Sequence, residues 1–304
     1  MKAIVAIKSL KENPYFFEKA NKLFTAITYV ENRPTANEMA NFLSNVDVAI
    51  IGAREKIDEQ IFLSASNPAK IIGTLSVGLD HLDVEFLENN GVKIINSPTA
   101  NVVSVAEHIM AFAFCLTKRL KQSDIAVQQN TGRSGVQNSP TELAGKTLGL
   151  IGYGKIAKTV ASMAKCLGLT IIATSANRTS GHEGNVSFHS LEFVLSNSQI
   201  INISVPLNAS TKNLINEKKL KLLRRNSILI NTSRSEVVDH NAVFEFLRNG
   251  ILDGYAEDGD NIPSYLSLRN DVICSPHLAG LTKESSDRLD NELIDGIEVY
   301  LKTK

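Results

Sequence analysis

Short apolar runs alternate with helical patterns along the first hundred residues of the chain. The apolar runs read, in order, KAIVAI, AITYV, VDVAIIG, AKIIGTLS and VKIINS, and helical patterns lie between them, for example from Pro14 to Phe24 and from Thr35. Strands separated by helices are typical of parallel βαβ units whose sheet is covered on both faces. We therefore predict a first α/β domain over residues 1–100.

A long helical pattern leads from this domain to a second one. The stretch SVAEHIMAFAFCLTKRLKQSDIAVQQN reads as one uninterrupted helix, and the polar, turn-rich TGRSGVQNSP follows it. We place the domain boundary near Pro98 to Asn101. From Thr147 the alternation resumes with TLGLIG, TIIATS, QIINISV, SILINTS, ILDGYAE and DVICSP, which predicts a second doubly wound sheet over residues 101–280.

The C-terminal tail, residues 281–304, has the pattern of an amphipathic helix. We expect it to fold back and complete the first domain. The predicted fold class is therefore α/β, with two doubly wound, Rossmann-like parallel sheets.

Composition fits a protein that buries a sizeable core and carries no dominant charge. Of the 304 residues, 43% are hydrophobic and 21% are charged, with 32 basic and 32 acidic side chains. This balance argues against nucleic acid or an anionic membrane as a partner. The first apolar run is too short for a signal peptide, and no run is long enough for a membrane helix, so we expect a cytoplasmic protein.

The spacing of the cysteines does not match a metal site or a redox motif. Cys115, Cys166 and Cys274 are isolated in apolar surroundings rather than placed at metal-ligand or redox spacing. We expect them to serve core packing, with reduced thiols, and we predict no metal site.

A glycine-rich turn follows the strand TLGLI. The sequence GYGKIA supplies Gly152, Gly154 and Ala157 in the G-x-G-x-x-G/A pattern, and a helix begins near Lys155. Gly152 permits the tight turn, Gly154 lets the backbone approach a pyrophosphate, and the helix N-terminus faces the anion. The alternative is a strand-to-helix turn without a ligand, but the strand before and the helix after favour a dinucleotide.

The end of the next strand lacks the acidic residue that accepts hydrogen bonds from the ribose of NAD. Ser175 stands in its place, followed by Asn177 and Arg178. A carboxylate would repel the 2′-phosphate of NADP, whereas these three side chains can donate hydrogen bonds to it. The pattern favours NADP(H). The alternative is that Arg178 is a solvated surface charge and that the site also accepts NAD(H).

Two further polar residues follow apolar strands. Arg234 lies just beyond SILINTS and His277 just beyond DVICSP, where open α/β sheets bind their ligands. An Arg there can pair with a carboxylate or a polarised carbonyl, and a His can exchange a proton near neutral pH. Alternatively, Arg234 caps a helix and His277 is a structural side chain.

Several motifs along nearly the whole chain give it a family resemblance. GTLSVGLDHLD, NVVSVAEHIM, LAGKTLGLIGYGKIA, VPLNASTKNLIN, INTSRSEVVD and SPHLAG stand in the order and approximate spacing of the D-isomer-specific 2-hydroxyacid dehydrogenases, which the chain resembles. The resemblance implies a cleft between two lobes, a substrate-binding domain formed by residues 1–100 with 281–304, and a dinucleotide-binding domain over 101–280. It also implies hydride transfer between a nicotinamide and C2 of a 2-keto or 2-hydroxy acid.

The resemblance assigns roles to individual residues. Arg234 matches the arginine that anchors the substrate carboxylate and polarises its carbonyl, and His277 matches the general acid. Backbone N–H groups of Ser76, Val77 and Gly78 match the loop that holds the carboxylate, and Asn101 matches a position that lines the cleft. The positions matched on the cofactor side are Val105, Lys155, Ile156, Val205, Pro206, Thr232 and Asp258, of which Asp258 corresponds to the acid that holds the carboxamide.

The chain departs from the family pattern in two places. The third catalytic residue of the family is a Glu whose negative charge favours the protonated histidine, and counting from Asp258 places it at Pro263. The connection is shorter than usual, so Asp260 is the candidate to reach His277 instead. The second departure is Ser235, where the family has Gly, and its Cβ restricts the backbone beside the substrate.

The sequence is compatible with two functions. The first is a reductase that uses NADP(H), or NAD(H), on a small 2-keto acid such as glyoxylate, hydroxypyruvate or a phospho or phosphonate analogue. The second is a dinucleotide-sensing regulatory protein on the same scaffold, which the missing Glu favours and the presence of Arg234 and His277 opposes. The resemblance also implies a homodimer built partly through the helix from Glu107 to Leu120.

Overall fold

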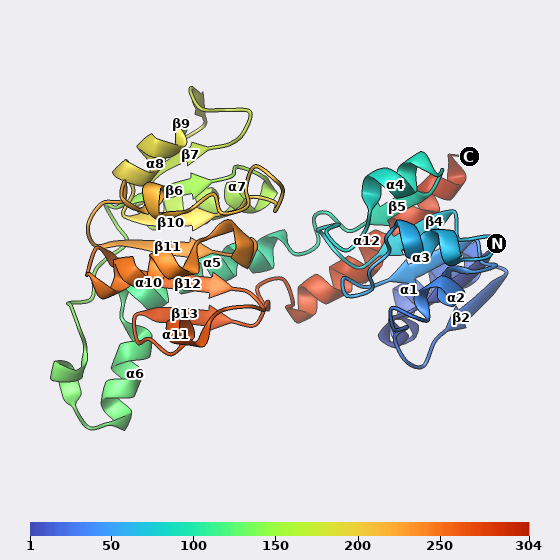
Figure 1. Cartoon of the computed structure of the whole chain (residues 1–304), viewed down its shortest axis with the longest axis horizontal. Helices are drawn as coiled ribbons and strands as arrows, with labels where there is room; N and C mark the ends of the chain where they lie inside the picture. Colours follow the sequence, from blue (N-terminus) through green and yellow to red (C-terminus); the bar gives the residue numbers. More distant parts are fainter. Residues whose placement is uncertain (304) are drawn as a thin grey trace. The chain divides into compact units, whose positions relative to one another are not determined.

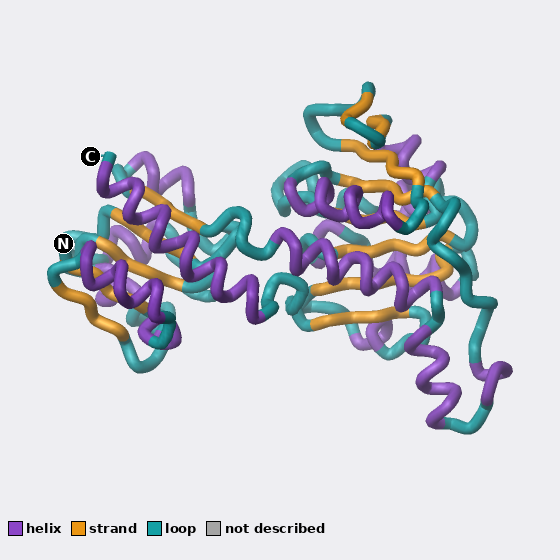
Figure 2. Tube along the Cα trace, turned by 180° about the vertical axis from the view of Figure 1, so that it is seen from behind, coloured by secondary structure: helices purple, strands orange, loops and turns teal. Residues whose placement is uncertain are grey.

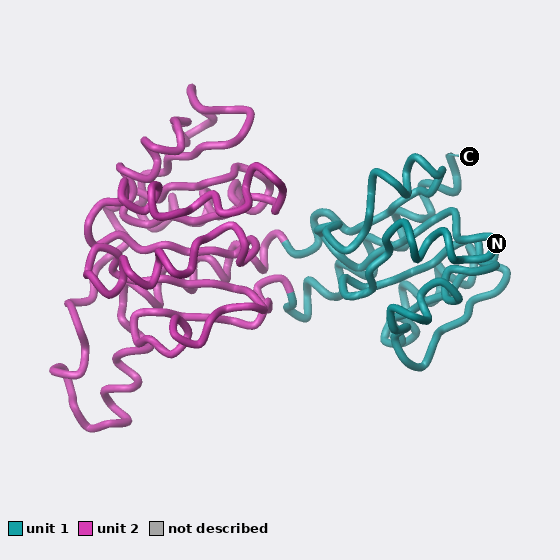
Figure 3. Tube along the Cα trace, viewed as in Figure 1, with its two compact units in different colours: residues 1–101, 281–304 teal, residues 102–280 magenta. Residues whose placement is uncertain are grey.

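The computed structural model describes residues 1–303, which form two compact units. Unit 1 consists of residues 1–101 and 281–304, and unit 2 of residues 102–280 (Figure 3). Each unit contains its own parallel sheet, so the predicted α/β class is confirmed. The ranges lie one residue from those expected, and the division into substrate and dinucleotide binding stays a prediction.

Unit 1 is built around a five-stranded parallel sheet. Its strand order is β2-β1-β3-β4-β5. The helix expected from Thr35 begins at Met39, because the Thr35 N–H and hydroxyl donate to Glu38 and form a turn instead. The elements of this unit are β1 (Lys2–Val5), η1 (Lys8–Lys11), α1 (Pro14–Leu23), β2 (Ala26–Tyr29), α2 (Met39–Leu43), β3 (Val48–Ile51), α3 (Glu59–Ser64), β4 (Ile71–Thr74), α4 (Val84–Asn89), β5 (Lys93–Asn96) and α12 (Lys283–Lys302).

The tail helix α12 contributes directly to the core of unit 1. Its residues Leu293, Ile294 and Ile297 are fully buried among the strands, and a Cβ on Gly73 of β4 would come within 3.2 Å of Ile297. Figure 2 shows α12 running along the sheet beside α1. The glycine therefore lets the helix approach the sheet closely.

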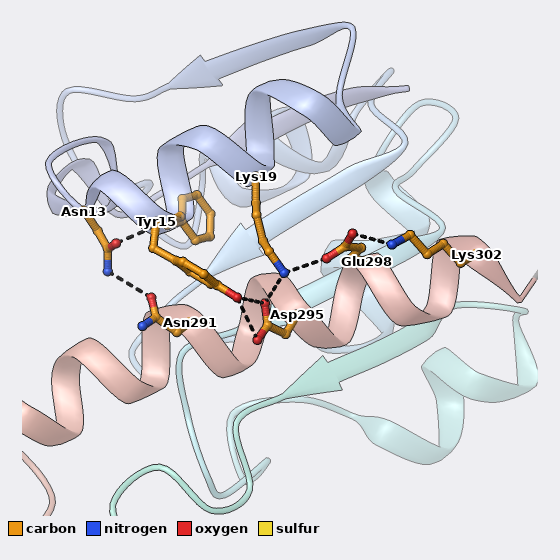
Figure 4. Close-up of polar contacts among 8 residues, drawn as sticks. Asn13, Tyr15, Lys19, Asn291, Asp295, Glu298 and Lys302 are labelled. Atoms are coloured by element: carbon orange, nitrogen blue, oxygen red, sulfur yellow. Dashed lines mark hydrogen bonds and ion pairs between the residues drawn. The ribbon is translucent and has the colours of Figure 1, made fainter.

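Polar contacts join α12 to α1 along their exposed edge (Figure 4). Lys19 reaches Asp295 at 2.7 Å and Glu298 at 2.6 Å, and Tyr15 donates to Asp295 at 2.9 Å. Hydrogen bonds from Lys19 and Lys302 lower the pKa of Glu298 to about 2. These contacts fix the register of the two helices, while the buried apolar residues supply most of the stabilisation.

Unit 2 contains an eight-stranded sheet in the order β13-β12-β11-β10-β6-β7-β9-β8. Its two short strands β8 and β9 were not predicted, and β8 runs antiparallel to β9 through a tight turn at Gly184 (φ +57°), so the sheet is not wholly parallel. The elements of this unit are α5 (Val102–Thr117), α6 (Leu120–Gln128), η2 (Gly132–Gly135), β6 (Thr147–Ile151), α7 (Lys155–Cys166), β7 (Thr170–Thr174), β8 (His182–Glu183), β9 (Val186–Phe188), α8 (Leu191–Asn197), β10 (Ile200–Ile203), α9 (Glu217–Leu220), β11 (Ser227–Asn231), η3 (Ser235–Val237), α10 (His240–Arg248), β12 (Leu252–Asp258), α11 (Ser264–Ser267) and β13 (Val272–Ser275).

Helices cover both faces of this sheet. On one face α5 and α7 pack their apolar residues against β6, β7 and β11, and on the other face α8, α9 and α10 pack against β10 and β11 (Figure 1). Because both faces are covered, the central strands are buried at nearly every position.

The long helix predicted after the boundary is interrupted, which corrects the sequence interpretation. Arg119 has a left-handed backbone (φ +56°) and separates α5 from α6. Its side chain is only 4% exposed; it donates to the Asp253 carbonyl at 3.0 Å and forms an ion pair with the Asp253 carboxylate. The buried ion pair offsets the strained backbone, and hydrophobic periodicity alone carries no signal for it.

The expected burial of the cysteines also needs correction. Cys166 is exposed at the C-terminal end of α7, whereas Cys115 and Cys274 are half-buried. Burial raises the pKa of the Cys274 thiol to about 11. Across residues 1–303, no helix has the length and apolar character needed to cross a membrane.

Candidate functional site

The topology of unit 2 gathers the predicted chemistry at one edge of its sheet. Arg234 follows β11, Asp258 ends β12, and His277 follows β13, and these three strands are parallel neighbours. The glycine-rich turn and Ser175 follow β6 and β7 at the same edge. Ligands of open α/β sheets bind at the carboxyl ends of the strands, so this edge is the candidate site.

The turn between β6 and α7 has the features needed to hold a pyrophosphate. Gly152 has φ +91°, and a Cβ there would lie 2.2 Å from the Ser204 carbonyl oxygen, so only glycine fits. A Cβ on Gly154 would meet no atom within 4 Å, which leaves open space before its backbone. No side chain caps the N-terminus of α7, so the first N–H groups of this helix are not satisfied by a cap.

The loop that carries Arg234 is fixed by a buried asparagine. Asn231 accepts hydrogen bonds from the Ser233 N–H at 3.1 Å and the Ser233 hydroxyl at 2.7 Å, and its amide donates to the Arg234 carbonyl at 3.0 Å. The Arg234 guanidinium donates to the Ser233 carbonyl at 2.9 Å. Sequence reasoning did not single out Asn231. The available signal was its position as a polar residue at the end of the apolar strand β11.

A buried carboxylate lies directly behind this loop. Glu257 is fully buried and accepts hydrogen bonds from Ser235 and Tyr255 and one at 2.7 Å involving Nε2 of His240. Burial and the neighbouring Glu257 raise the pKa of the Tyr255 phenol. Ser235, noted above as a departure from the family, is thus held by a hydrogen bond to this buried carboxylate. The sequence offered no sign of this cluster beyond an acidic residue in an apolar strand.

His277 is presented by an unusual backbone that Asp258 stabilises. Its φ is +52°, a conformation that few non-glycine residues adopt. The Asp258 carboxylate accepts from the backbone N–H groups of Leu278 at 2.7 Å and Ala279 at 2.9 Å, and also from the Ser275 hydroxyl. Asp258 therefore holds the histidine loop in place, a function that sequence reasoning did not assign to it.

An acidic side chain other than the family's glutamate lies beside His277. Nδ1 of His277 lies 3.8 Å from Oδ2 of Asp260, and both side chains are exposed. Pro263 precedes α11 as its N-cap residue and offers no acidic group. Asp260 is therefore an acidic residue beside His277, as the sequence suggested.

A second histidine lies behind Asp258. Nε2 of His108, on α5, is 2.9 Å from the Ser275 hydroxyl, which also donates to Asp258. Partial burial lowers the pKa of His108, and the Asp258 charge opposes part of that shift. The neutral form of His108 is thus favoured next to the loop that carries His277.

The region proposed for the adenosine ribose contains an acid that sequence reasoning missed. Ser175 and Arg178 close a tight turn through two backbone hydrogen bonds of 3.0 and 3.1 Å, and Asn177 is exposed between them. Arg178 forms an ion pair with Glu183 at 2.7 Å, and Lys158 of α7 forms another at 2.8 Å. The missed acid is Glu183, which lies at the end of β8 in the β8–β9 hairpin. Because this hairpin was not predicted, the sequence did not indicate that Glu183 lies near the ribose site.

The remaining cofactor positions lie around the same edge. Val205 and Pro206 follow β10, the first half-buried and the second exposed. Thr232 follows β11 with a buried hydroxyl that has no hydrogen-bond partner. Lys155 and Ile156 open α7, and Val105 is buried in α5. An orphaned hydroxyl at the strand end is consistent with a ligand group that would complete its bonding.

Unit 1 holds the predicted substrate loop at the end of β4. The Ser76 hydroxyl donates to the Gly78 carbonyl at 2.5 Å, and the Asn96 amide donates to the Val77 carbonyl at 2.9 Å, which fixes the loop. Oδ1 of Asn101 is buried without a partner. Over residues 1–303 no group of three or more His, Cys, Asp or Glu side chains is placed to hold a metal ion.

Comparisons with known proteins place this geometry in context. The family model for the D-isomer specific 2-hydroxyacid dehydrogenase NAD-binding domain matches residues 110–279, more than half of the chain. The glyoxylate reductase of Aeropyrum pernix is 32% identical over 255 residues, which are 80% of this chain and 76% of that protein. The chain spans 42% of the length of another relative, D-3-phosphoglycerate dehydrogenase 2, chloroplastic, of Arabidopsis thaliana, at 28% identity.

Solved structures that match over the whole chain include the following two. Acyclic imino acid reductase (Bsp5), in complex with NADPH and D-Arg, has a TM-score of 0.87 at 27% identity and is covered over 98% of its length. D-lactate dehydrogenase from Aquifex aeolicus, complexed with NAD and lactic acid, has a TM-score of 0.82 at 25% identity and is covered over 96%. These matches confirm the resemblance seen in the motifs, and the chain belongs to the D-isomer specific 2-hydroxyacid dehydrogenase family.

Proposed function

We propose that the protein is an NAD(P)-dependent oxidoreductase that transfers a hydride between a nicotinamide and C2 of a small 2-keto or 2-hydroxy acid, with NADP(H) favoured. The observation that carries the proposal is the placement of Arg234, Asp258 and His277 at the ends of three neighbouring strands. Family membership and the uncapped N-terminus of α7 support a dinucleotide at the same edge.

Arg234 binds and orients the substrate. Its planar guanidinium can donate two parallel hydrogen bonds to a carboxylate, and a further N–H can polarise the adjacent carbonyl. The Asn231 clamp holds the backbone of this residue, so little ordering of the loop is required when the acid binds.

His277 moves the proton. In the reductive direction its protonated imidazole donates a proton to the carbonyl oxygen of the substrate, and in oxidation it takes the proton back from the hydroxyl. Asp258 keeps the histidine loop in its strained conformation through the Leu278 and Ala279 N–H groups. Asp260 supplies a negative charge beside the imidazole, with its Oδ2 3.8 Å from Nδ1 of His277.

The residues present fit a nicotinamide dinucleotide. The open space at Gly154, the uncapped helix and the orphaned Thr232 hydroxyl would hold it, with Arg178 and Lys158 near a 2′-phosphate. When bound, the dinucleotide supplies or accepts the hydride.

The test is turnover with a panel of acids. Purified protein is mixed with NADPH or NADH and with glyoxylate, hydroxypyruvate, pyruvate or a phosphorylated 2-keto acid, and the nicotinamide absorbance is followed. We expect steady oxidation with at least one small 2-keto acid, and a faster rate with NADPH. Binding of NADPH without turnover on any acid would instead support a dinucleotide-sensing protein.

A second candidate substrate is an imino acid. The Bsp5 structure is described as an acyclic imino acid reductase and shares this fold at 27% identity. A C=N bond is more basic than a C=O bond, so its reduction demands less of the proton donor, and the Asp260 carboxylate beside the His277 ring lies 3.8 Å from it, too far for a hydrogen bond. Repeating the panel with methylamine present tests it, because an imine reductase gains turnover from the amine.

A further inference from the structure

Glu183 lies between two positive side chains at the edge of the proposed cofactor site. One carboxylate oxygen is 2.8 Å from Nζ of Lys158 and the other is 2.7 Å from a terminal nitrogen of Arg178. Lys158 comes from the first turn of α7, Arg178 from the turn after β7, and Glu183 from the β8–β9 hairpin. One carboxylate thus bridges three segments.

These two cations stand where a 2′-phosphate would be recognised. In folds of this type the residues after the second strand contact the adenosine ribose, and a basic side chain there accommodates the extra phosphate of NADP. Ser175 and Arg178 occupy that position after β7. The phosphate would therefore meet the same guanidinium and ammonium groups that Glu183 now holds.

Arg178 is not a loosely solvated charge. Its guanidinium carbon lies 3.9 Å from the centre of the Phe188 ring, and its other terminal nitrogen donates to the His182 carbonyl. Phe188 in turn contacts Tyr153, the residue between Gly152 and Gly154, with ring centres 5.0 Å apart. The guanidinium is thus held in a fixed place next to the glycine-rich turn.

We propose that Glu183 is a specificity-determining residue that occupies the position of the 2′-phosphate and must release Lys158 and Arg178 before NADP(H) can bind there. The inference rests on the proposed function and extends it. A 2′-hydroxyl, as in NAD(H), carries no charge and leaves both ion pairs intact. Glu183 therefore limits the preference for NADP(H) that its two partners would otherwise create.

The charges of Glu183 and Lys158 support a competition between Glu183 and the 2′-phosphate for the same cations. Hydrogen bonding with Lys158 lowers the pKa of Glu183, and the same bond raises the pKa of Lys158. Glu183 and Lys158 are thus both charged at neutral pH. An incoming phosphate is repelled by the Glu183 carboxylate and attracted by Lys158 and Arg178. Removing the carboxylate charge therefore removes the repulsion and leaves the attraction in place.

The experiment compares the dissociation constants of NADPH and NADH, measured by titration of the intact protein, for wild type and Glu183→Gln. We expect the variant to bind NADPH about threefold to tenfold more tightly, a modest gain because the site is solvent-exposed and screened by salt. Its affinity for NADH should change less than about twofold. Glu217→Gln, which removes an exposed charge paired with Lys221, should leave both constants as in wild type.

A double variant separates a local effect from a change in net charge. In an Arg178→Ala background the gain from Glu183→Gln should shrink to less than about half, because one of the freed cations is absent. An undiminished gain in that background overturns the proposal, and so does a NADPH-to-NADH ratio unaffected by Glu183→Gln. If wild type binds neither dinucleotide, the proposed function itself fails, a result distinct from an unchanged ratio.

Discussion

Nδ1 of His277 lies 3.8 Å from Oδ2 of Asp260, each residue following the C-terminal end of one of two neighbouring strands. The separation is too long for a hydrogen bond but within reach of charge attraction. Both side chains are exposed, at 47% and 71%, so water weakens the attraction. The carboxylate therefore places a negative charge beside the imidazole without fixing its ring.

We expect Asp260→Asn to lower kcat for 2-keto acid reduction more than it changes KM. The carboxylate places a negative charge beside the proposed proton donor, and the amide removes that charge while keeping the size of the side chain. The loss should be less than about tenfold because solvent screens the pair. Initial rates at varied 2-keto acid concentration measure kcat and KM.

The matched control for this variant is Asp124→Asn on α6, which removes an exposed carboxylate that accepts only from Gln128. Its kcat should equal that of wild type. An Asp260→Asn variant whose kcat is also unchanged would show that His277 acts without help from Asp260.

Glu257→Gln should reduce both stability and substrate affinity. The buried carboxylate accepts from three side chains, so its replacement leaves at least one donor unsatisfied and lowers the free energy of unfolding by about 1 to 3 kcal/mol. Because Ser235 adjoins Arg234, KM for the 2-keto acid should rise more than kcat falls. Urea denaturation and steady-state kinetics test the two parts.

Glu245→Gln serves as the comparison, because Glu245 forms an exposed ion pair with Arg248 on the same helix as His240. It should change stability by less than about 0.5 kcal/mol. If Glu257→Gln lowers stability but leaves KM unaltered, the cluster supports the fold without positioning Arg234.

His108 should make the protein less stable in mild acid. Burial lowers its pKa below the ordinary value of about 6.5, so the unfolded chain binds more protons at acid pH than the native one does. The stability linked to His108 is fully present above that ordinary value. It is lost as the pH falls from there through the lowered value in the folded protein.

The measurement is urea denaturation at pH 7.5 and pH 5.0 for wild type and His108→Gln. Wild type should lose more stability than the variant between the two conditions, by up to about 1 kcal/mol after solvent screening is allowed for. Equal losses would mean that His108 is protonated as easily in the folded protein as in the unfolded chain.

The three cysteines should differ in their reactivity. With a pKa of about 11, only about one Cys274 thiol in a thousand is ionised at pH 8, and the side chain is half-buried. Brief treatment with iodoacetamide should therefore label the exposed Cys166 first, as peptide mass spectrometry would show. All three should react in urea, and rapid labelling of Cys274 in the native protein would contradict its burial.

The sequence predicted the elements that rest on strong periodicity. Buried parallel strands are continuous apolar runs, so both sheets and the strand-end positions of Arg234 and His277 could be located. The β8–β9 hairpin escaped detection because its strands are two and three residues long. The break at Arg119 escaped because a buried ion pair, not local propensity, sets its backbone.

Polar contacts between elements were the part of the site that could not be predicted. Glu183 meets Lys158 across two elements, and Glu257 meets Ser235 and His240 through the register of β11 and β12. Such pairings depend on which side chains the fold brings together. Hydrophobic patterns in a single sequence predict the elements but not the contacts between their polar side chains. The family motifs nevertheless located the main chemical groups.

Transfer of deuterium from NADPH to the substrate would show the proposed hydride transfer to C2 itself. The protein is incubated with NADPH carrying two deuterium atoms at C4 of the nicotinamide and with hydroxypyruvate or the best acid of the panel, and the product is analysed by mass spectrometry and NMR. We expect a 2-hydroxy acid with one deuterium at C2 for each NADPH oxidised, and loss of the transfer in Arg234→Ala. Oxidation of NADPH without deuterium at C2, or binding without any product, would contradict the proposed transfer.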